Sequence, residues 1–286
     1  GSSELTIENG TYYAGLTCVQ AGDSSVAYIE DGSLRASTGY SNTYWLLNLI
    51  DNSEAQIVVM GGSFENFDPA YSKTENPVAD FCAEGYISTS TTDEKNTIYT
   101  VVALDEENSV AKVTGSGKTT YFETLPKAVA AAKDGETVTL LKDASGDGVV
   151  VPSGSNIVID FAGYTYDIDG TTVGSTGTET NGFQLLKNST IEFRNGTLTS
   201  SKAKILIQNY SNLTLKDMTL DGTGLLGANP YVVSNNCGNV TITGDTSIIA
   251  APGGVAFDVY YWPAGGYGEG VSVTLNTTGT ITGNIE

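Results

Sequence analysis

The chain has 286 residues, of which 13 are Lys or Arg, 33 are Asp or Glu and none is His, giving a formal net charge of −20. A hydrophobic content of 40% is enough for a sizeable core, whereas the negative charge disfavours nucleic acids and anionic membrane surfaces as partners. Without histidine, the chain has no Ser-His-Asp or Cys-His catalytic system and no site that depends on a histidine ligand.

The N-terminal third repeats a short pattern, a strand of alternating apolar residues followed by Gly-Thr or Gly-Ser. Copies occur at residues 5–12, 26–34 and 55–64, and Ile29 follows Ile7 by 22 residues. Such a period is typical of a solenoid, in which each coil buries its apolar side against the next.

Two further strands, at residues 83–87 and 97–102, are predicted to close this N-terminal series as a pair. A polar linker is expected to follow at residues 104–117.

A helix is predicted over residues 124–134. Thr124 has the side chain of an N-cap, Pro126 stands near the first helical position, and Gly135 is a stop signal. Because the end of a solenoid exposes unpaired strand groups and open core, we expect this helix to cover one end.

The C-terminal part carries two interleaved families of short strands. The first apolar positions of one family are residues 157, 191, 213, 240 and 271, and strands of the other begin at residues 183, 204, 231 and 256. Variable insertions between short strands favour a parallel β-solenoid, with a β-sandwich of antiparallel strands as the alternative. Asparagines precede three of these strands, and we expect them to stack along the axis: Asn156, Asn212 and Asn239.

The predicted fold class is therefore all-β, a parallel β-helix with one short capping α-helix. Residues 1–103 are expected to form the last coils and closing strands of one β-helical unit. Residues 118–286 are expected to form the cap and first coils of a second unit.

A resemblance to a known family is carried by residues 122–128 through 140–143 and by residues 61–64, 83–86 and 98–101. These segments resemble bacterial surface proteins of the pectate-lyase-like right-handed β-helix superfamily, and similar segments occur in proteins of some phages. The resemblance implies a right-handed parallel β-helix whose cap comes first and whose closing strands come last. Here the closing part comes first, which suggests a slice from a tandem array with two open ends.

Open solenoid ends have a physical consequence. Each exposes a row of unpaired backbone groups beside apolar core. We therefore expect residues 1–30 of one molecule to be able to stack on residues 271–286 of another, giving head-to-tail self-association.

Carboxylates cluster locally in the C-terminal part. Asp160, Asp167 and Asp169 lie within ten residues, and stacked coils could bring such side chains together as Ca²⁺ ligands. A catalytic carboxylate pair and solvated turn residues are the alternatives, and no catalytic residue is assigned.

Aromatic residues form the other candidate site. In the stretch 257–262, Asp258, Tyr260 and Trp262 alternate with Phe257, Val259 and Tyr261, so the first set could face outward if the second is core. Flat apolar faces beside a carboxylate suit a sugar or a protein partner. Tyr231 is added to this ligand-binding set, and core packing is the alternative interpretation.

The most consistent function is a non-catalytic, extracellular β-helical stalk or adhesin segment of a secreted or wall-attached bacterial protein. Its expected partner is a glycan or a host surface protein, with neither nucleic-acid binding nor membrane insertion. The alternatives are a polysaccharide lyase or glycoside hydrolase of the same superfamily and a phage fibre component. Three cysteines without metal-type spacing are expected as small buried side chains, or with one disulfide: Cys18, Cys82 and Cys237.

Overall fold

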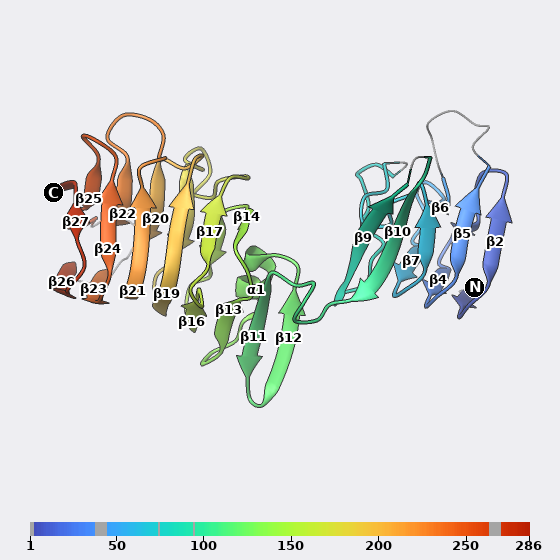
Figure 1. The fold of residues 1–286 in the computed structure, drawn as a ribbon, viewed down its shortest axis with the longest axis horizontal. Coiled ribbons are helices and arrows are strands. Elements are labelled where there is room, and N and C mark those ends of the chain that lie inside the picture. The colour runs from blue at the N-terminus through green and yellow to red at the C-terminus, as the bar shows by residue number, and fades with distance from the viewer. Residues whose placement is uncertain (1–2, 38–44, 74, 94, 263–269) are drawn as a thin grey trace. The chain divides into compact units, whose positions relative to one another are not determined.

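The computed structural model describes residues 3–37, 45–73, 75–93, 95–262 and 270–286 (Figure 1). The chain divides into two compact units, Gly1–Leu104 and Asp105–Glu286, and each has its own hydrophobic core. The described residues form an all-β protein with one helix, and that helix is too short to cross a bilayer.

The first unit is built from parallel strands in successive coils. Two sheets contain three parallel strands, and a third sheet contains two. The strands are β1 (Glu4–Ile7), β4 (Val26–Ile29) and β7 (Gln56–Val59); β2 (Thr11–Ala14), β5 (Ser33–Ala36) and β8 (Ser63–Glu65); and β3 (Val19–Ala21) with β6 (Leu47–Leu49).

An antiparallel hairpin closes the first unit, as the sequence predicts. Its strands are β9 (Tyr86–Thr92) and β10 (Thr97–Ala103), and β10 runs antiparallel to β8. A parallel solenoid has no such pairing inside it, so the hairpin ends the stack of coils on this side.

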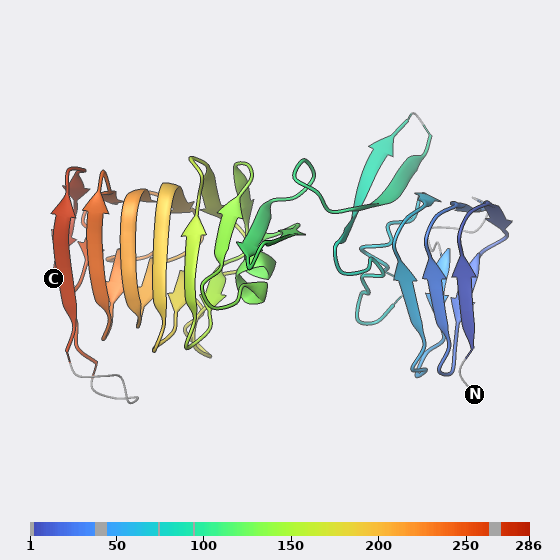
Figure 2. The same ribbon diagram turned by 90° about the horizontal axis from the view of Figure 1, so that it is seen from below.

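The described residues of the second unit form six coils, and each coil contributes one strand, or half of a long strand, to each of three faces (Figure 2). Within each face the strands run parallel. The first face holds β13 (Thr137–Leu140), β16 (Asn156–Asp160), the first halves of β19 (Thr190–Ser200) and β21 (Asn212–Gly222), β23 (Asn239–Gly244) and β26 (Ser272–Thr277). The second holds β14 (Ala144–Gly146), β17 (Thr165–Ile168), the second halves of β19 and β21, β24 (Ser247–Ala250) and β27 (Ile281–Thr282). The third holds β15 (Val149–Val151), β18 (Asn181–Leu185), β20 (Ile205–Asn209), β22 (Tyr231–Asn235), β25 (Val255–Phe257) and β28 (Asn284–Ile285).

Neighbouring coils of the second unit run parallel on all three faces. The expectation of stacked parallel strands is confirmed, and the antiparallel sandwich is wrong for these strands. The architecture is consistent with a β-solenoid.

The first coil of the second unit is covered by a hairpin and the helix. Strand β11 (Ala111–Gly115) pairs antiparallel with β12 (Lys118–Phe122) and with β13. Residues 111–115 fall inside the range expected to be a linker; they form a strand because Ala111 and Val113 face the core and are buried.

Helix α1 (Leu125–Ala131) lies where the sequence predicts a cap. The hydroxyl of Thr124 accepts a hydrogen bond from the backbone N–H of Lys127 at 3.3 Å, and Pro126 occupies the first turn. The helix ends at Ala131 because Ala132 is already extended. Leu125, Ala128 and Val129 are buried in the core of the unit, so the helix covers the interior of the first coil.

The interior of the second unit consists of rows of side chains in register from coil to coil. One row is fully buried through five coils, which makes the core continuous along the axis; its members are Val138, Ile159, Phe193, Leu215 and Ile242. Complete burial of a side chain of this size contributes about 1.5–3 kcal/mol relative to leaving it exposed.

Candidate binding groove

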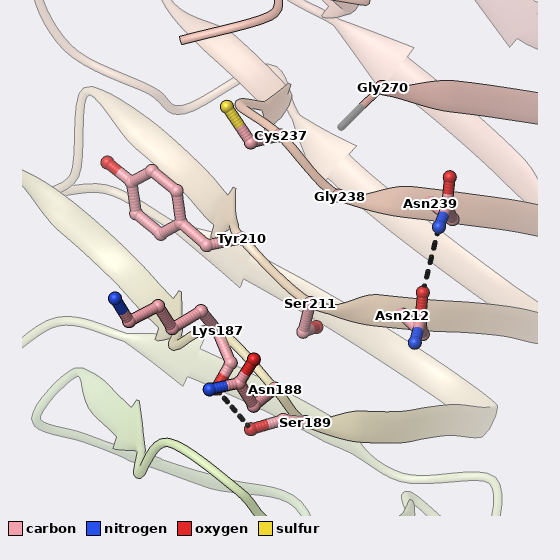
Figure 3. Close-up of a pocket in the computed structure, with 10 residues that line it drawn as sticks. All are labelled: Lys187, Asn188, Ser189, Tyr210, Ser211, Asn212, Cys237, Gly238, Asn239 and Gly270. Atoms are coloured by element: carbon pink, nitrogen blue, oxygen red, sulfur yellow. Dashed lines mark hydrogen bonds between the residues drawn. The ribbon is translucent and has the colours of Figure 1, made fainter. Parts of the chain in front are cut away.

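A polar groove of about 180 Å³ follows the turns that connect the third face of the second unit to the first (Figure 3). Successive coils contribute one turn each, so the groove runs across the coils. Its lining is Lys187, Asn188, Ser189, Tyr210, Ser211, Asn212, Cys237, Gly238, Asn239 and Gly270.

The turns align because the strands on both sides of them are in register. Leu185, Asn209 and Asn235 end the third-face strands as direct partners, and Thr190, Asn212 and Asn239 begin the first-face strands as direct partners. The chain reverses through left-handed backbone at Asn188 (φ 63°) and Cys237 (φ 69°). Asparagine tolerates this conformation well, whereas a cysteine there is uncommon.

Two buried amides hold the turns from inside. Asn209 donates to Ser211 O at 3.0 Å and to Asn235 Oδ1 at 2.9 Å, and its own Oδ1 accepts from the N–H and hydroxyl of Ser211. Asn235 donates to Gly238 O at 3.0 Å and to Ser272 O at 3.3 Å. Because every N–H of both amides has a partner, the network rigidifies the floor of the groove.

A second amide ladder lies outside, at the start of the first-face strands. Asn239 donates to Asn212 Oδ1 at 3.0 Å, and the hydroxyl of Ser272 donates to Asn239 Oδ1 at 2.8 Å. The expected stacking of Asn212 and Asn239 is therefore confirmed. Asn156 does not join them, because its partner in the next coil is Thr190.

The side chains on the two walls of the groove differ in chemistry. In Figure 3, Lys187, Tyr210 and Cys237 lie on one side and Asn212 and Asn239 on the other. One wall thus offers an ammonium group and an aromatic ring, and the other offers amides. Neither Lys187 nor Tyr210 was singled out from the sequence.

The structure places two of the predicted aromatic residues beside this groove. Tyr260 forms an isolated parallel β-bridge with Asn236. The Cys237 thiol donates a hydrogen bond to Trp262 O (2.9 Å) and accepts one from the backbone N–H of Trp262 (2.8 Å). The rings of Tyr260 and Trp262 meet edge to face at 6.4 Å between centroids, and both side chains are about half exposed. An exposed aromatic pair therefore adjoins the turn at Cys237.

The expected alternation in residues 257–262 is only partly correct. Phe257 is buried and Asp258, Tyr260 and Trp262 are less buried, but Val259 and Tyr261 are exposed as well. The reason is that β25 ends at Phe257, so the period-two pattern of a strand does not continue.

Asp258 and Tyr231 have other partners than the aromatic pair. The Asp258 carboxylate accepts from the backbone N–H of Asn235 and, at 3.5 Å, from the Ser234 hydroxyl. Burial raises the pKa of Asp258, and nearby Glu286 raises it further against the lowering effect of those bonds. The Tyr231 hydroxyl donates to Glu286 at 3.2 Å, and burial followed by this carboxylate raises its pKa.

The predicted Ca²⁺ ligands lie on two faces. Asp160, on the first face, accepts from Arg194 Nε at 2.9 Å and from Asn195 Nδ2 at 3.2 Å. Asp167 and Asp169 lie at the second face, where burial and then the charge of Asp169 raise the pKa of Asp167. Within the described ranges no three His, Cys, Asp or Glu side chains are grouped to hold a metal ion. The Ca²⁺ site stays a prediction.

The three cysteines form no disulfide and are only partly buried. They are thus neither fully buried small side chains nor members of a disulfide in this structure.

No family model matches the chain, and no curated protein or solved structure matches it either.

Proposed function

We propose that the chain is a non-catalytic, extracellular segment of a bacterial surface protein that binds a glycan in the groove of stacked turns. The proposed architecture is a right-handed parallel β-helix of the pectate-lyase-like type, acting as a stalk or adhesin. A phage fibre segment would use the same chemistry at the same groove.

The observation that carries the proposal is a polar groove whose floor is fixed by fully bonded amides. Sugar hydroxyls exchange hydrogen bonds with amides and hydroxyls, and the apolar face of a sugar ring stacks on an aromatic ring. Asn212, Asn239 and Ser211 supply the polar groups, and Tyr210 supplies a ring.

Charge favours an acidic sugar. The net charge of −20 would repel a polyanion, but Lys187 places an ammonium group at the groove itself. A sialylated or uronic-acid-containing glycan can thus pair its carboxylate with Lys187 while its hydroxyls meet the asparagines.

The test is a glycan array with the intact chain and with single variants. Tyr210→Ala and Lys187→Ala are expected to abolish or strongly reduce the signal, and Trp262→Ala to weaken it because that ring adjoins the groove. Tyr164→Ala is the matched control, because this tyrosine is 37% exposed but belongs to the turn between β16 and β17.

Binding that survives Tyr210→Ala and Lys187→Ala would exclude the groove. If the chain binds a host protein but no glycan, and Tyr210→Ala and Lys187→Ala remove that binding, the groove remains the binding site but its ligand is a protein.

A polysaccharide-active enzyme is the second candidate, favoured by the raised pKa of Asp258 near Glu286 and Tyr231. A carboxyl group with a raised pKa stays protonated to a higher pH and can act as a general acid. We expect pectin, alginate and mucin glycans to give no products, with or without Ca²⁺. Product formation that Asp258→Asn abolishes would favour the enzyme instead.

A further inference from the structure

The first unit contains an apolar groove that the proposed glycan site does not use. The groove has a volume of about 400 Å³, within the range of about 300–1,000 Å³ that is usual for ligand sites. One wall is formed by residues 55–58, which include most of β7, and the other by residues 79–84. Leu49, at the end of β6, completes the lining.

Strand β7 is the last parallel strand of its sheet and has one edge that faces the groove. The backbone N–H of Gln56 donates to Ser25 O at 3.0 Å, on the side of the preceding coil. Alternate residues of a strand direct their N–H and C=O groups to opposite sides. The backbone groups of Ile57 and Val59 therefore point away from the preceding coil.

The segment opposite pairs with one of these two residues and then leaves the sheet. Both outward backbone groups of Val59 bond to residues 81–83, at 2.8 and 2.9 Å. Just before this pairing the segment runs elsewhere, because Ala79 exchanges two backbone hydrogen bonds with Ser72. Among the residues that the structure describes, no strand pairs with β7 on this side at Ile57. The groove is the space where that pairing is missing.

The floor of the groove is apolar and continuous with the core of the unit. Ile57 and Phe81 are buried members of that core, whereas Leu49, Ala79 and Cys82 pack against it and stay partly exposed. An apolar side chain that enters the groove would remove this surface from water, which favours binding.

The rim of the groove is acidic. Asp80 and Glu84 line it and are both exposed, and the carboxylate of Glu75 accepts from the N–H of Leu49 at 3.1 Å. Within the described ranges, the residues that line the groove include no Lys or Arg. Residues 1–104 as a whole contain 14 Asp or Glu against 3 Lys or Arg. A basic segment therefore complements the rim, and an acidic one is repelled.

We propose that the groove binds a basic, extended polypeptide segment of a partner protein, which adds to β7 as a further strand. The backbone of the segment bonds to the outward N–H and C=O of Ile57. An apolar side chain enters the groove, and lysine or arginine side chains meet Asp80 and Glu84. In this mode of recognition main-chain pairing supplies affinity, while the pocket and the charges supply specificity.

The test is calorimetric titration of the intact chain with a defined probe, a short peptide of alternating lysine and valine with acetylated and amidated ends. We expect binding at low ionic strength that weakens as salt screens the charges. A peptide with glutamate in place of lysine should not bind. Hydrogen exchange at the Ile57 amide should slow in the complex, because this N–H gains a partner.

The rim is tested by Asp80→Asn combined with Glu84→Gln. This variant should weaken binding of the probe about 2- to 30-fold, the effect of losing two exposed ion pairs. The amide introduced at position 80 still offers an oxygen to the Cys82 N–H, which bonds to Asp80 at 2.9 Å. Circular dichroism checks that the variant is folded.

The matched control is Glu8→Gln combined with Glu30→Gln. It removes the same charge from two exposed residues of the same unit that do not line the groove. Binding of the probe should be unchanged, which separates the rim from the overall negative charge of the chain.

Strand pairing is tested from the side of the probe, without altering the protein. One peptide is methylated at the backbone nitrogen of every valine, and a second at that of every lysine. Because the N–H groups of alternate residues face opposite sides of a strand, only one set can donate to β7. One methylated peptide should therefore bind like the probe, and the other should lose binding.

Three results would overturn the proposal. The first is that the lysine-valine probe does not bind at low salt. The second is that Asp80→Asn with Glu84→Gln binds the probe as tightly as the control variant does. The third is equal behaviour of the two methylated peptides, which would mean that no single edge of the peptide pairs with β7.

Discussion

The buried amide of Asn235 connects the fold to the groove, and its removal gives the most informative prediction. Asn235→Ala deletes two donated hydrogen bonds, to Gly238 O and Ser272 O, and one accepted from Asn209 Nδ2. Gly238 and Asn209 are buried, so water cannot replace the lost partner there. Each buried group left without a partner costs about 1–3 kcal/mol.

With two such groups, we therefore expect Asn235→Ala to lower the free energy of opening the turns around the groove by about 2–6 kcal/mol. Ser272 is exposed, so water satisfies its carbonyl and it adds little. Against a typical total stability of about 5–15 kcal/mol, this loss is large. Hydrogen exchange with mass spectrometry over β20–β23 measures it directly, because exchange rates report local opening.

Asn212→Ala is the control for this prediction. It removes an amide from the outer ladder, where the side chain is exposed, so the expected cost is below about 1 kcal/mol. Equal, small effects of Asn212→Ala and Asn235→Ala would refute the reasoning that the inner amides hold the turns.

Three further substitutions probe the second unit. Gly238→Ala should destabilise it by about 1–3 kcal/mol in urea unfolding, because the added Cβ would lie 2.5 Å from Ser211 O, whereas Gly15→Ala, with open space around it, should be neutral. Tyr166→Phe should cost about 1 kcal/mol by the same assay, because the buried phenol donates to Asp147 O at 2.7 Å; no change would mean that this bond adds nothing. Folding raises the pKa of Asp258 above 3.8, so the stability that its protonated form contributes is fully present below that pH and is lost as pH rises through the folded pKa. Asp258→Asn should therefore flatten the dependence of the urea midpoint on pH above about 4. An unchanged slope would contradict the raised pKa.

Sequence patterns predict the strands well where one side chain in two is buried. Residues 157, 191, 213 and 240 are direct partners in one buried interior row, and Thr124 caps the helix. The sequence pattern wrongly predicts a linker over residues 111–115, where β11 lies. Only two residues of this strand are buried, so in sequence it resembles a polar loop.

The groove could not be predicted, because its residues become neighbours only through the register of the coils. Asn209 and Asn212 stand three positions apart and look equivalent as polar residues near a turn, yet one is fully buried and the other exposed. Lys187 and Tyr210 follow strands in two different coils, and only the parallel pairing of β18 with β20 brings them together. Recurrence of Ser or Gly before residues 190, 212 and 239 was the available signal for aligned turns.

The parallel stacking of β21 and β23 underlies the groove, and disulfide trapping measures it directly. Direct partners in a sheet lie about 4.8 Å apart, within the range that a disulfide spans, whereas residues four positions out of register are about 13 Å apart. With the native cysteines replaced by serine, the cysteine pairs at 212 with 239 and at 214 with 241 should both oxidise, and the pair at 212 with 243 should not. Oxidation of the 212–243 pair together with failure of the 212–239 pair would mean that these strands run antiparallel.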